Sequence, residues 1–299
     1  MLTKKGFLVV GLVLLVLSFA GLGVSASDYD DYKPDESSKQ TGFSSLQAIN
    51  PEVIGWLTLY DTPVDYPLLH SEDNHKYLSL DALGNSNSVG SIFLDYRSSS
   101  DFSDFNTIVY GHHVAGGQVF GSLKYFVDED YFAKHRYGSI YYGGRERGLE
   151  ILAILEADAY DETIYQPAVK TTEERQAYYQ YLLSKAKHKR DVAVSASSKL
   201  VLLSTCYVDV TNGRHLLVAK ITDKVTQGVA TSAGTEKSGF LLGLDDLYDR
   251  LTLVPVWMLF VLACVLLVLA LMMIGVILYL RARLKTILTF SRKNNKEAI

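Results

Sequence analysis

Short apolar segments recur through the middle of the chain, and glycine, proline, asparagine, aspartate or serine residues separate them. Segments of this length, rich in β-branched and aromatic residues, are typical of β-strands. The pattern predicts strands at residues 53–59, 63–69, 90–96, 106–111, 138–142, 149–158, 199–205 and 214–222. Eight strands in one region predict a mainly β fold, and we expect them to close into a barrel.

One segment follows the periodicity of a helix instead. Over residues 172–189, apolar or aromatic residues stand at positions 177, 178, 181 and 182, and a threonine stands at the start. Threonine before such a pattern is suited to a helix N-terminus. We therefore expect an accessory helix between the sixth and seventh strands. By contrast, residues 28–45 and 226–239 are rich in serine, threonine, glycine and charge, which is typical of linkers.

Two long uncharged segments flank the β region. Residues 6–26 follow Lys4 and Lys5 and end in Val-Ser-Ala, which is typical of a secretory signal, either cleaved or retained as an anchor. Residues 254–280 would extend roughly 40 Å as a helix, because each residue adds about 1.5 Å. The hydrocarbon core of a bilayer is roughly 30 Å thick. We therefore expect a transmembrane helix near the C-terminus.

The distribution of charge predicts which side of the membrane each part occupies. The segment after residue 280 carries six basic residues and one acidic residue, so the positive-inside rule predicts a cytoplasmic tail and an extracellular domain. The region between the two apolar segments carries 32 acidic and 21 basic residues, a net charge of about −11. This balance argues against a nucleic-acid partner. The sequence also has no glycine-rich phosphate loop and no cluster of metal ligands, so no cofactor or metal is expected.

The two cysteines lie in different environments. Cys264 falls within the apolar segment 254–280, so it could not reach a thiol in an exported domain. Cys206 ends an apolar run in the predicted exported domain. Because Cys264 is out of reach, we expect Cys206 to be an unpaired cysteine outside the cell. Because secreted proteins usually pair their cysteines, an unpaired one is a candidate for a reactive thiol. A small buried apolar residue at the end of a strand is the alternative.

A nucleophilic thiol needs a neighbouring base or cation to lower its pKa from about 8.5. Among seven histidines, His112 and His113 stand out, because they directly follow a predicted strand and Gly111. Adjacent residues in extended backbone project to opposite sides, so we expect at most one of the pair to face the thiol. Arg214 opens the apolar run after Cys206, and its permanent charge suits it to an oxyanion. A surface arginine and two surface loop histidines are the alternatives.

Several motifs, in order, resemble the sortases, the cysteine transpeptidases of Gram-positive cell surfaces. They are "LLSTC" at the end of a strand, an arginine opening the next strand, and "YGHH" upstream. The family signature is Thr-Leu-x-Thr-Cys, in which Leu202 replaces the first threonine here, whereas Leu203, Thr205 and Cys206 match. "NPEVIGWLTL", "VDYPLLHSEDNHKYL" and "GSIFLDYR" resemble class B sortases in particular, as does the helix before the cysteine strand. The resemblance implies a sortase-type β-barrel with accessory helices.

Together, these observations divide the chain into six parts. They are a signal peptide or signal anchor at 1–26, a linker at 27–45, a sortase catalytic domain at 46–225, a second linker at 226–250, a transmembrane helix at 251–280 and a basic cytoplasmic tail at 281–299.

The resemblance also implies roles for individual residues. Cys206 matches the nucleophile, His112 the acid and base, and Arg214 the group that steadies the substrate carbonyl and its oxyanion. His113 matches no assigned role. With weaker support, four further positions match residues that line the class B site and are expected to bind substrate: Asn74, Tyr110, Ser204 and Thr205.

The resemblance implies the class of substrate. Sortases cleave a sorting signal of the LPxTG type in a secreted protein and transfer the acyl group to an amine, here either a pilin lysine or a peptidoglycan precursor. The C-terminal membrane segment, and the absence of an Asp-Pro-aromatic lid motif before His112, favour a class B-type enzyme in pilus assembly over one that anchors proteins to the wall. A hydrolytic cysteine protease and a non-catalytic surface scaffold are alternatives of other classes, although the caspase-type and papain-type cysteine contexts are missing.

Overall fold

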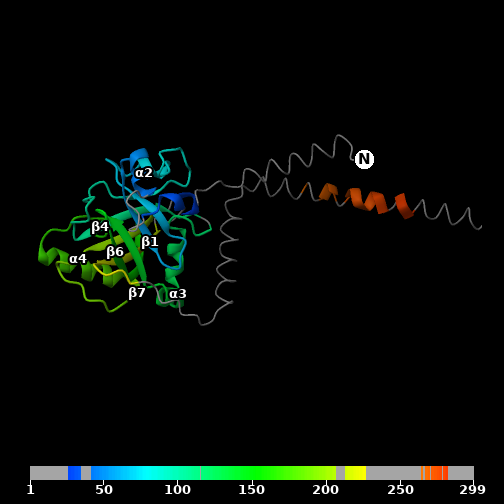
Figure 1. Cartoon of the computed structure of the whole chain (residues 1–299). Coiled ribbons are helices and arrows are strands. Elements are labelled where there is room, and N and C mark those ends of the chain that lie inside the picture. The colour runs from blue at the N-terminus through cyan, green and yellow to red at the C-terminus, as the bar shows by residue number, and fades with distance from the viewer. Residues whose placement is uncertain are drawn as a thin grey trace, which may run out of the picture. The chain divides into compact units, whose positions relative to one another are not determined.

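The computed structural model describes residues 26–34, 42–114, 116–206 and 213–226, together with residues 264, 267–269, 271–277 and 279–281. The chain divides into one unit that ends at Asp246 and a second unit from Leu247 to Ile299. Figure 1 shows the first unit as a mixed domain in which helices lie around a sheet. Nearly all of the basic tail and of the signal segment, and most of the second linker, lie outside the described residues.

The strands of the first unit form one closed barrel. The sheet order is β5-β1-β2-β3-β4-β8-β9-β6, and pairing between β5 and β6 closes the ring of eight. The β2–β3 and β4–β8 pairs are parallel, and the other pairs are antiparallel. The eight strands are β1 (Val53–Leu59), β2 (Asp65–Leu69), β3 (Ile92–Leu94), β4 (Asn106–His112), β5 (Tyr137–Tyr142), β6 (Arg145–Asp158), β8 (Leu200–Cys206) and β9 (Gly213–Thr222). The predicted mainly β fold and its eight-stranded barrel are confirmed.

The longest strand, β6, turns the corner of the barrel. Its first part pairs with both β5 and β9, and its second part pairs with β9 and with a ninth strand, β7 (Ala186–Lys189). Gly148 lies where these pairings overlap, and a Cβ atom there would lie 2.2 Å from the Lys224 carbonyl oxygen. Only glycine allows this close approach of the β9 end to the β6 backbone.

The predicted helix is shorter than expected. Helix α4 (Thr172–Lys185) begins with a capping box, in which the Thr171 hydroxyl accepts from the Glu174 N–H and the Glu174 carboxylate accepts from the Thr171 N–H. The prediction that the helix continues to residue 189 is wrong. Residues 186–189 alternate between half-buried and exposed, as a strand requires, and β7 pairs antiparallel with β6.

The described residues of the first unit form five further helices, and α2 (Gly42–Ile49) begins within residues 28–45, the predicted linker. Tyr29 of η1 and Phe43 and Leu46 of α2 are almost completely buried in the core, so both helices pack on the barrel. The burial of these large apolar side chains explains why η1 and α2 pack against the core. The five are η1 (Ala26–Tyr32), α2 (Gly42–Ile49), η2 (Lys76–Leu78), η3 (Gly121–Val127) and α3 (Glu129–Lys134).

Two apolar clusters bury opposite faces of the central strands. Val201 and Leu203 of β8 belong to the larger cluster, whereas Leu200 and Leu202 belong to a second one that includes Leu182 of α4. Because side chains of a strand alternate between faces, a strand covered on both faces needs an unbroken apolar run. This explains the sequence "LVLL" that leads to Cys206.

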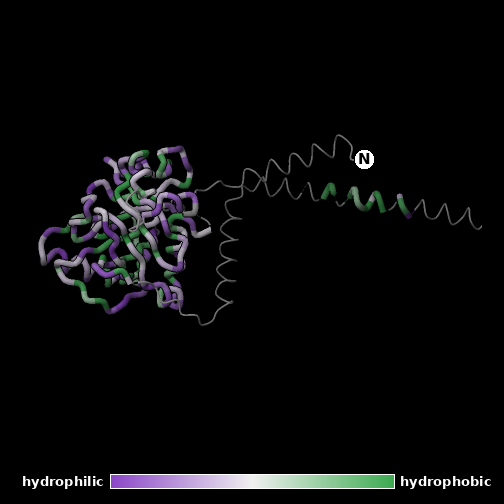
Figure 2. The backbone as a smooth tube through the Cα atoms, viewed as in Figure 1, coloured by the Kyte–Doolittle hydropathy of each residue, from purple (hydrophilic) through white to green (hydrophobic). Residues whose placement is uncertain are grey.

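The second unit is described over short helical stretches between residues 264 and 281. Figure 2 shows these stretches as mainly hydrophobic, and Leu271, Met272 and Met273 are among their exposed side chains. Among the residues that the structure describes, no helix combines the length and hydropathy that crossing a bilayer requires. The transmembrane helix therefore stays a prediction.

Candidate active site

Two parallel strands end side by side and carry the predicted catalytic pair. The register of β4 on β8 runs from Asn106 opposite Leu200 to His112 opposite Cys206. Both strands therefore end at the same edge of the barrel, although 93 residues separate them in the sequence. The structure describes Cys206 as the last residue of β8, while its side chain and residues 207–212 lie outside the described part.

The end of β4 is fixed by close packing behind His112. A Cβ atom on Gly111 would lie 2.7 Å from the Phe120 ring and 2.9 Å from Ile92 Cγ2, so a larger residue has no room. Beyond the strand the chain turns back, and the Phe120 N–H donates to the His112 carbonyl over 3.1 Å. The glycine before the histidines thus lets the strand reach this edge while the next segment packs against it.

The two adjacent histidines have different surroundings. His112 is half-buried, and its Nε2 lies 2.9 Å from the Leu78 carbonyl oxygen. A carbonyl oxygen only accepts hydrogen bonds, so Nε2 carries a proton in this contact. The His113 ring instead lies 6.5 Å from the ring of His215, and burial lowers the pKa of His215. The two rings thus have different neighbours, Leu78 of η2 for His112 and His215 of β9 for His113, and the expectation that at most one of them faces the thiol stays a prediction.

Arg214 lies at the same edge, on the strand next to β8. The β8–β9 register pairs Ser204 with Leu216, and the His215 N–H donates to Thr205 Oγ1 over 3.1 Å. Arg214 is the next residue along β9 and is half-buried. Three adjacent strands therefore bring His112, Cys206 and Arg214 to one edge of the barrel.

A buried carboxylate, Asp95, accepts hydrogen bonds from two of the residues that are predicted to bind substrate. Its side chain is completely buried and accepts from Arg97 Nε and Nη2, each over 2.8 Å. Tyr110 Oη donates to Asp95 Oδ2 over 3.0 Å, and Asn74 Nδ2 donates to the same oxygen over 3.2 Å. Asn74 and Tyr110, predicted from separate motifs, thus share one acceptor.

The charges in this group support one another. Burial opposes ionisation of Asp95, but hydrogen bonds from Arg97 and Tyr110, with the charge of Arg97, outweigh it and hold the pKa of Asp95 below its ordinary value. The same carboxylate, added to burial, raises the pKa of the Tyr110 phenol. Asp95 is therefore ionised, and Tyr110 is a neutral donor at physiological pH.

The group extends to Ser204 through Tyr165, which lies in the connection between β6 and α4. Arg97 Nη2 donates to the Tyr165 carbonyl oxygen over 3.1 Å, and the Tyr110 and Tyr165 rings stack with centroids 6.3 Å apart. The Tyr165 hydroxyl then lies 3.0 Å from Ser204 Oγ. Ser204 and Thr205 are almost completely buried, and the Thr205 hydroxyl accepts from the backbone of β9 instead of joining this group.

Sequence reasoning missed Asp95, Arg97 and Tyr165. An acid and an arginine two residues apart, directly after the apolar strand in "FLDYR", could have indicated the first two. Tyr165 carries no such signal, since it is one of 20 tyrosines in the chain. Among the residues that the structure describes, no group of three or more His, Cys, Asp or Glu side chains is placed to hold a metal ion.

Comparison with known proteins identifies the class of enzyme. Sortase B of Listeria monocytogenes is 34% identical over 181 residues, which are 60% of this chain and 73% of that protein. A crystal structure of sortase B from the type II pilus of Streptococcus pneumoniae is 52% identical, with a TM-score of 0.54, and covers 62% of this chain and 100% of that one. A Streptococcus pyogenes class B sortase involved in pilus biogenesis is 31% identical, with a TM-score of 0.56 and the same coverage. No family model matches the chain.

The barrel and these relatives define a cysteine transpeptidase. The chain belongs to the sortase family, and within it to class B. The family assignment decides against the hydrolytic protease and the non-catalytic scaffold, which were the alternatives left open by the sequence.

Proposed function

We propose that this sortase joins pilin subunits by cleaving an LPxTG-like sorting signal and transferring the acyl group to a pilin lysine. Two relatives described as pilus-associated support the pilin role, one of them 52% identical to this chain. The observation that carries the chemistry is the register of β4 on β8, with His112 opposite Cys206. The alternative acceptor is the amine of a peptidoglycan precursor, which would make the enzyme a wall-anchoring one.

In the proposed first step the Cys206 thiolate attacks the carbonyl carbon of the scissile peptide bond. The carbonyl oxygen becomes an oxyanion, and Arg214 is assigned to stabilise it. One such donor is commonly worth roughly 3–4 kcal/mol in the transition state. The guanidinium suits this role because it stays charged and offers several donors in a fixed plane.

His112 is proposed to move the protons. The protonated imidazole donates to the leaving amine as the C–N bond breaks, which leaves a thioester between the substrate acyl group and Cys206 Sγ. The neutral imidazole then takes a proton from the incoming lysine amine, whose nitrogen attacks the thioester and releases the thiolate. Because the Leu78 carbonyl holds Nε2, we assign both transfers to Nδ1.

The polar group around Asp95 is proposed to shape the substrate side of the site. Arg97 fixes the backbone of Tyr165, and Tyr165 holds the Ser204 hydroxyl two residues before Cys206. Asn74 and Tyr110 contact the same carboxylate and are half-buried, so their remaining surface is available to a peptide. Binding of the sorting signal by Asn74, Tyr110, Ser204 and Thr205 stays a proposal.

The enzyme is proposed to act at the outer face of the cell membrane. The apolar segment 254–280 would hold the domain by its C-terminus beside emerging pilin precursors, with the basic tail in the cytoplasm. Protease treatment of intact cells should then remove the catalytic domain and spare the tail. A domain that stays protected would contradict this topology.

The pilin role is tested by deleting the gene in the source organism. A ladder of high-mass, detergent-resistant pilin polymers should collapse to monomer, while other wall-anchored proteins stay attached. Expression of the wild-type chain should restore the ladder, and expression of Cys206→Ala should not. A normal ladder in the deletion strain, with a monomeric surface protein shed into the medium, would favour wall anchoring instead.

A further inference from the structure

One cavity in the described part of the chain lies away from the catalytic edge. Its volume is about 590 Å³, and it lies between the β5–β6 hairpin, the end of β9 and the loop before β8. Lys199 lines it and directly precedes β8, whereas Cys206 ends that strand, so the length of β8, roughly 20 Å, separates the cavity from the catalytic edge. A volume of this size suits a small molecule.

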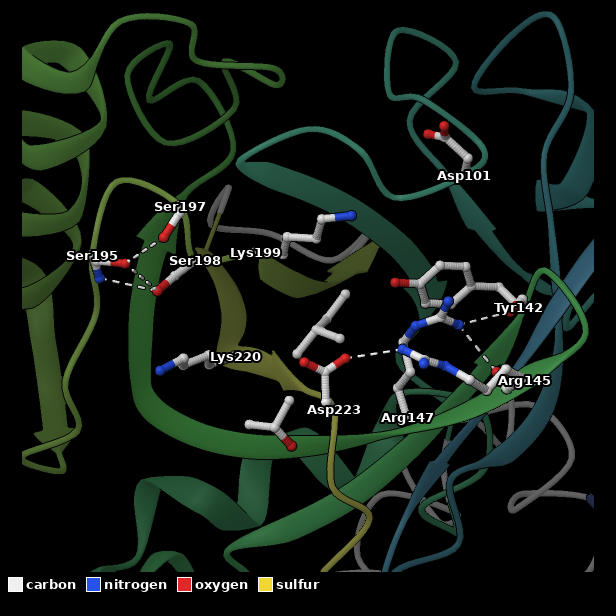
Figure 3. A pocket seen from close by; sticks show the side chains of 12 residues that line it. Asp101, Tyr142, Arg145, Arg147, Ser195, Ser197, Ser198, Lys199, Lys220 and Asp223 are labelled. Atoms are coloured by element: carbon white, nitrogen blue, oxygen red, sulfur yellow. Dashed lines mark hydrogen bonds and ion pairs between the residues drawn. The ribbon is translucent and has the colours of Figure 1, made fainter.

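The walls of this cavity are basic, although the surrounding domain is acidic. The charged side chains that line it are four cations, Arg145, Arg147, Lys199 and Lys220, and two carboxylates, Asp101 and Asp223. Figure 3 shows Lys199 on one side of the hollow and the arginines with Tyr142 on the other. The region between the apolar segments has a net charge of about −11, so a local excess of positive charge is a departure from the rest of the domain.

Uncharged groups hold two of these cations in place without neutralising them. Arg147 Nη1 donates to the Tyr142 and Arg145 carbonyl oxygens over 2.8 and 3.1 Å, and the guanidinium lies over the Tyr142 ring, 3.8 Å from its centroid. Lys220 Nζ donates to the Ala193 carbonyl oxygen over 2.6 Å. These contacts hold both cations in a fixed position without pairing them with a carboxylate, which is what an anion site requires.

Asp223 compensates this charge only weakly. Arg145 pairs with Asp223 over 2.9 Å, but Asp223 is 94% exposed and Arg145 is 57% exposed. Ion pairs at such exposure are screened by water and contribute little. An anion with more than one negative charge could therefore replace Asp223 as the partner of Arg145 while it also contacts Lys199.

Three serine hydroxyl groups also line this cavity. Ser195, Ser197 and Ser198 form a cluster in which Ser195 Oγ lies 2.9 Å from Ser197 Oγ and 3.3 Å from Ser198 Oγ. A hydroxyl both donates and accepts, so this cluster suits a ligand that carries hydroxyl groups beside its charge.

We propose that this cavity binds a phosphate ester of a small polyol. Arg145, Arg147 and Lys199 would contact the phosphate oxygens, and Lys220 and the serine cluster on the opposite side would contact the hydroxyl groups of the polyol (Figure 3). The phosphate could belong to an anionic lipid headgroup or to a soluble ester, and the experiment separates these sources. The proposal is independent of the proposed pilin role, because it uses no residue of the catalytic edge.

The test follows hydrogen exchange in the full chain, kept in a zwitterionic detergent. In one arm sn-glycerol 1-phosphate is added, with sodium chloride of equal ionic strength as the reference. In the other arm phosphatidylglycerol is mixed into the micelles, with phosphatidylcholine as the reference. We expect exchange of the amides in residues 191–199 and 218–224 to slow several-fold in at least one arm. Slowing with the lipid alone assigns the site to a headgroup, and slowing with the soluble ester assigns it to a free phosphate ester.

Matched variants link the effect to the cavity. Lys199→Gln combined with Lys220→Gln should abolish the slowing, and Lys199→Arg with Lys220→Arg should retain it, as should Lys134→Gln with Lys170→Gln at exposed sites elsewhere. Unchanged exchange of β4 and β8 amides confirms that the variants fold. No slowing in either arm, or slowing that survives in the glutamine pair at the cavity, would overturn the proposal.

Discussion

His112 and Cys206 occupy matched positions at the ends of two neighbouring parallel strands, β4 and β8. A parallel pair needs a long connection, and here that connection contains β5, β6, α4 and β7. The relative position of the two residues is therefore set by a continuous ladder of backbone hydrogen bonds rather than by a loop. Changes that leave this ladder intact should affect the chemistry without affecting the fold.

The two histidines should differ sharply in mutagenesis. His112→Ala should lower kcat/KM for transpeptidation by about 10²–10⁴-fold, the range that general acid–base catalysis supplies. His113→Ala should cost much less, because the His113 ring contacts His215 rather than the Leu78 carbonyl. Steady-state kinetics with a sorting-signal peptide and an amine acceptor measures both. A large loss of activity in His113→Ala and a small loss in His112→Ala would mean that His112 is wrongly assigned as the acid and base.

The contribution of Arg214 to kcat should depend on the shape of its side chain as well as on its charge. Arg214→Ala should lower kcat by about 10²–10³-fold, as loss of an oxyanion donor does. Arg214→Lys keeps the charge but loses the planar set of donors, so we expect only partial recovery. KM should change little in either variant if the contact forms mainly in the transition state. Full activity of the alanine variant would remove Arg214 from the mechanism.

Asp95→Asn should destabilise the domain, because the buried carboxylate accepts from Arg97, Tyr110 and Asn74. Hydrogen bonds to a charged group contribute about 1.5–3 kcal/mol, so a loss of that size in the free energy of unfolding is expected from urea denaturation. Asp191→Asn, at an exposed position, is the matched control and should change little. Equal stability of the two variants would contradict the structural role of Asp95.

The contribution of Asp95 should also depend on pH. Its pKa in the folded protein lies below the ordinary value of 3.8, so the ionised form stabilises the fold above that value. This stabilisation should be lost as the pH falls through the lowered pKa. The difference in unfolding free energy between wild type and Asp95→Asn should therefore be constant near neutral pH and shrink below about pH 4. A difference that grows with acid would contradict the sign.

The sequence predicted the barrel well because its central strands are covered on both faces. The unbroken apolar runs of β8 and β9, and the motifs at their ends, are local signals. β7 was missed because "AKHK" is short and charged and becomes a strand only by pairing with the edge of β6. The predicted helix extended into β7 because residues 172–189 contain no glycine or proline that would mark the end of α4.

The residues of the site also divide into those that a local motif indicates and those that only the fold brings together. His112, Cys206 and Arg214 belong to recognisable motifs, so the sequence could indicate them. Asp95 and Tyr165 act through partners that lie 15 and 39 residues away in the sequence, Tyr110 and Ser204. Only the closed barrel brings such residues together, and no periodicity or spacing encodes that contact.

The capping box of α4 offers a test of local structure. Thr171→Ala should cost about 1 kcal/mol, since it removes the hydroxyl that accepts from the Glu174 N–H. Thr172→Ala, one residue further along and exposed, removes no cap hydrogen bond, so it should destabilise the helix far less and serves as the control. Hydrogen exchange of the first-turn amides of α4 measures the difference. Equal exchange in the two variants would show that the cap contributes nothing.

Trapping the acyl-enzyme tests the central assignment most directly. The full chain is mixed with a sorting-signal peptide in the absence of an amine, quenched in acid, and examined by intact-mass and peptide mass spectrometry. We expect a mass increase equal to the acyl part of the peptide, on Cys206 alone, released on addition of an amine with formation of the amide product. The Cys206→Ala chain should show no adduct. An adduct on another residue, or amide formation by Cys206→Ala, would contradict the account.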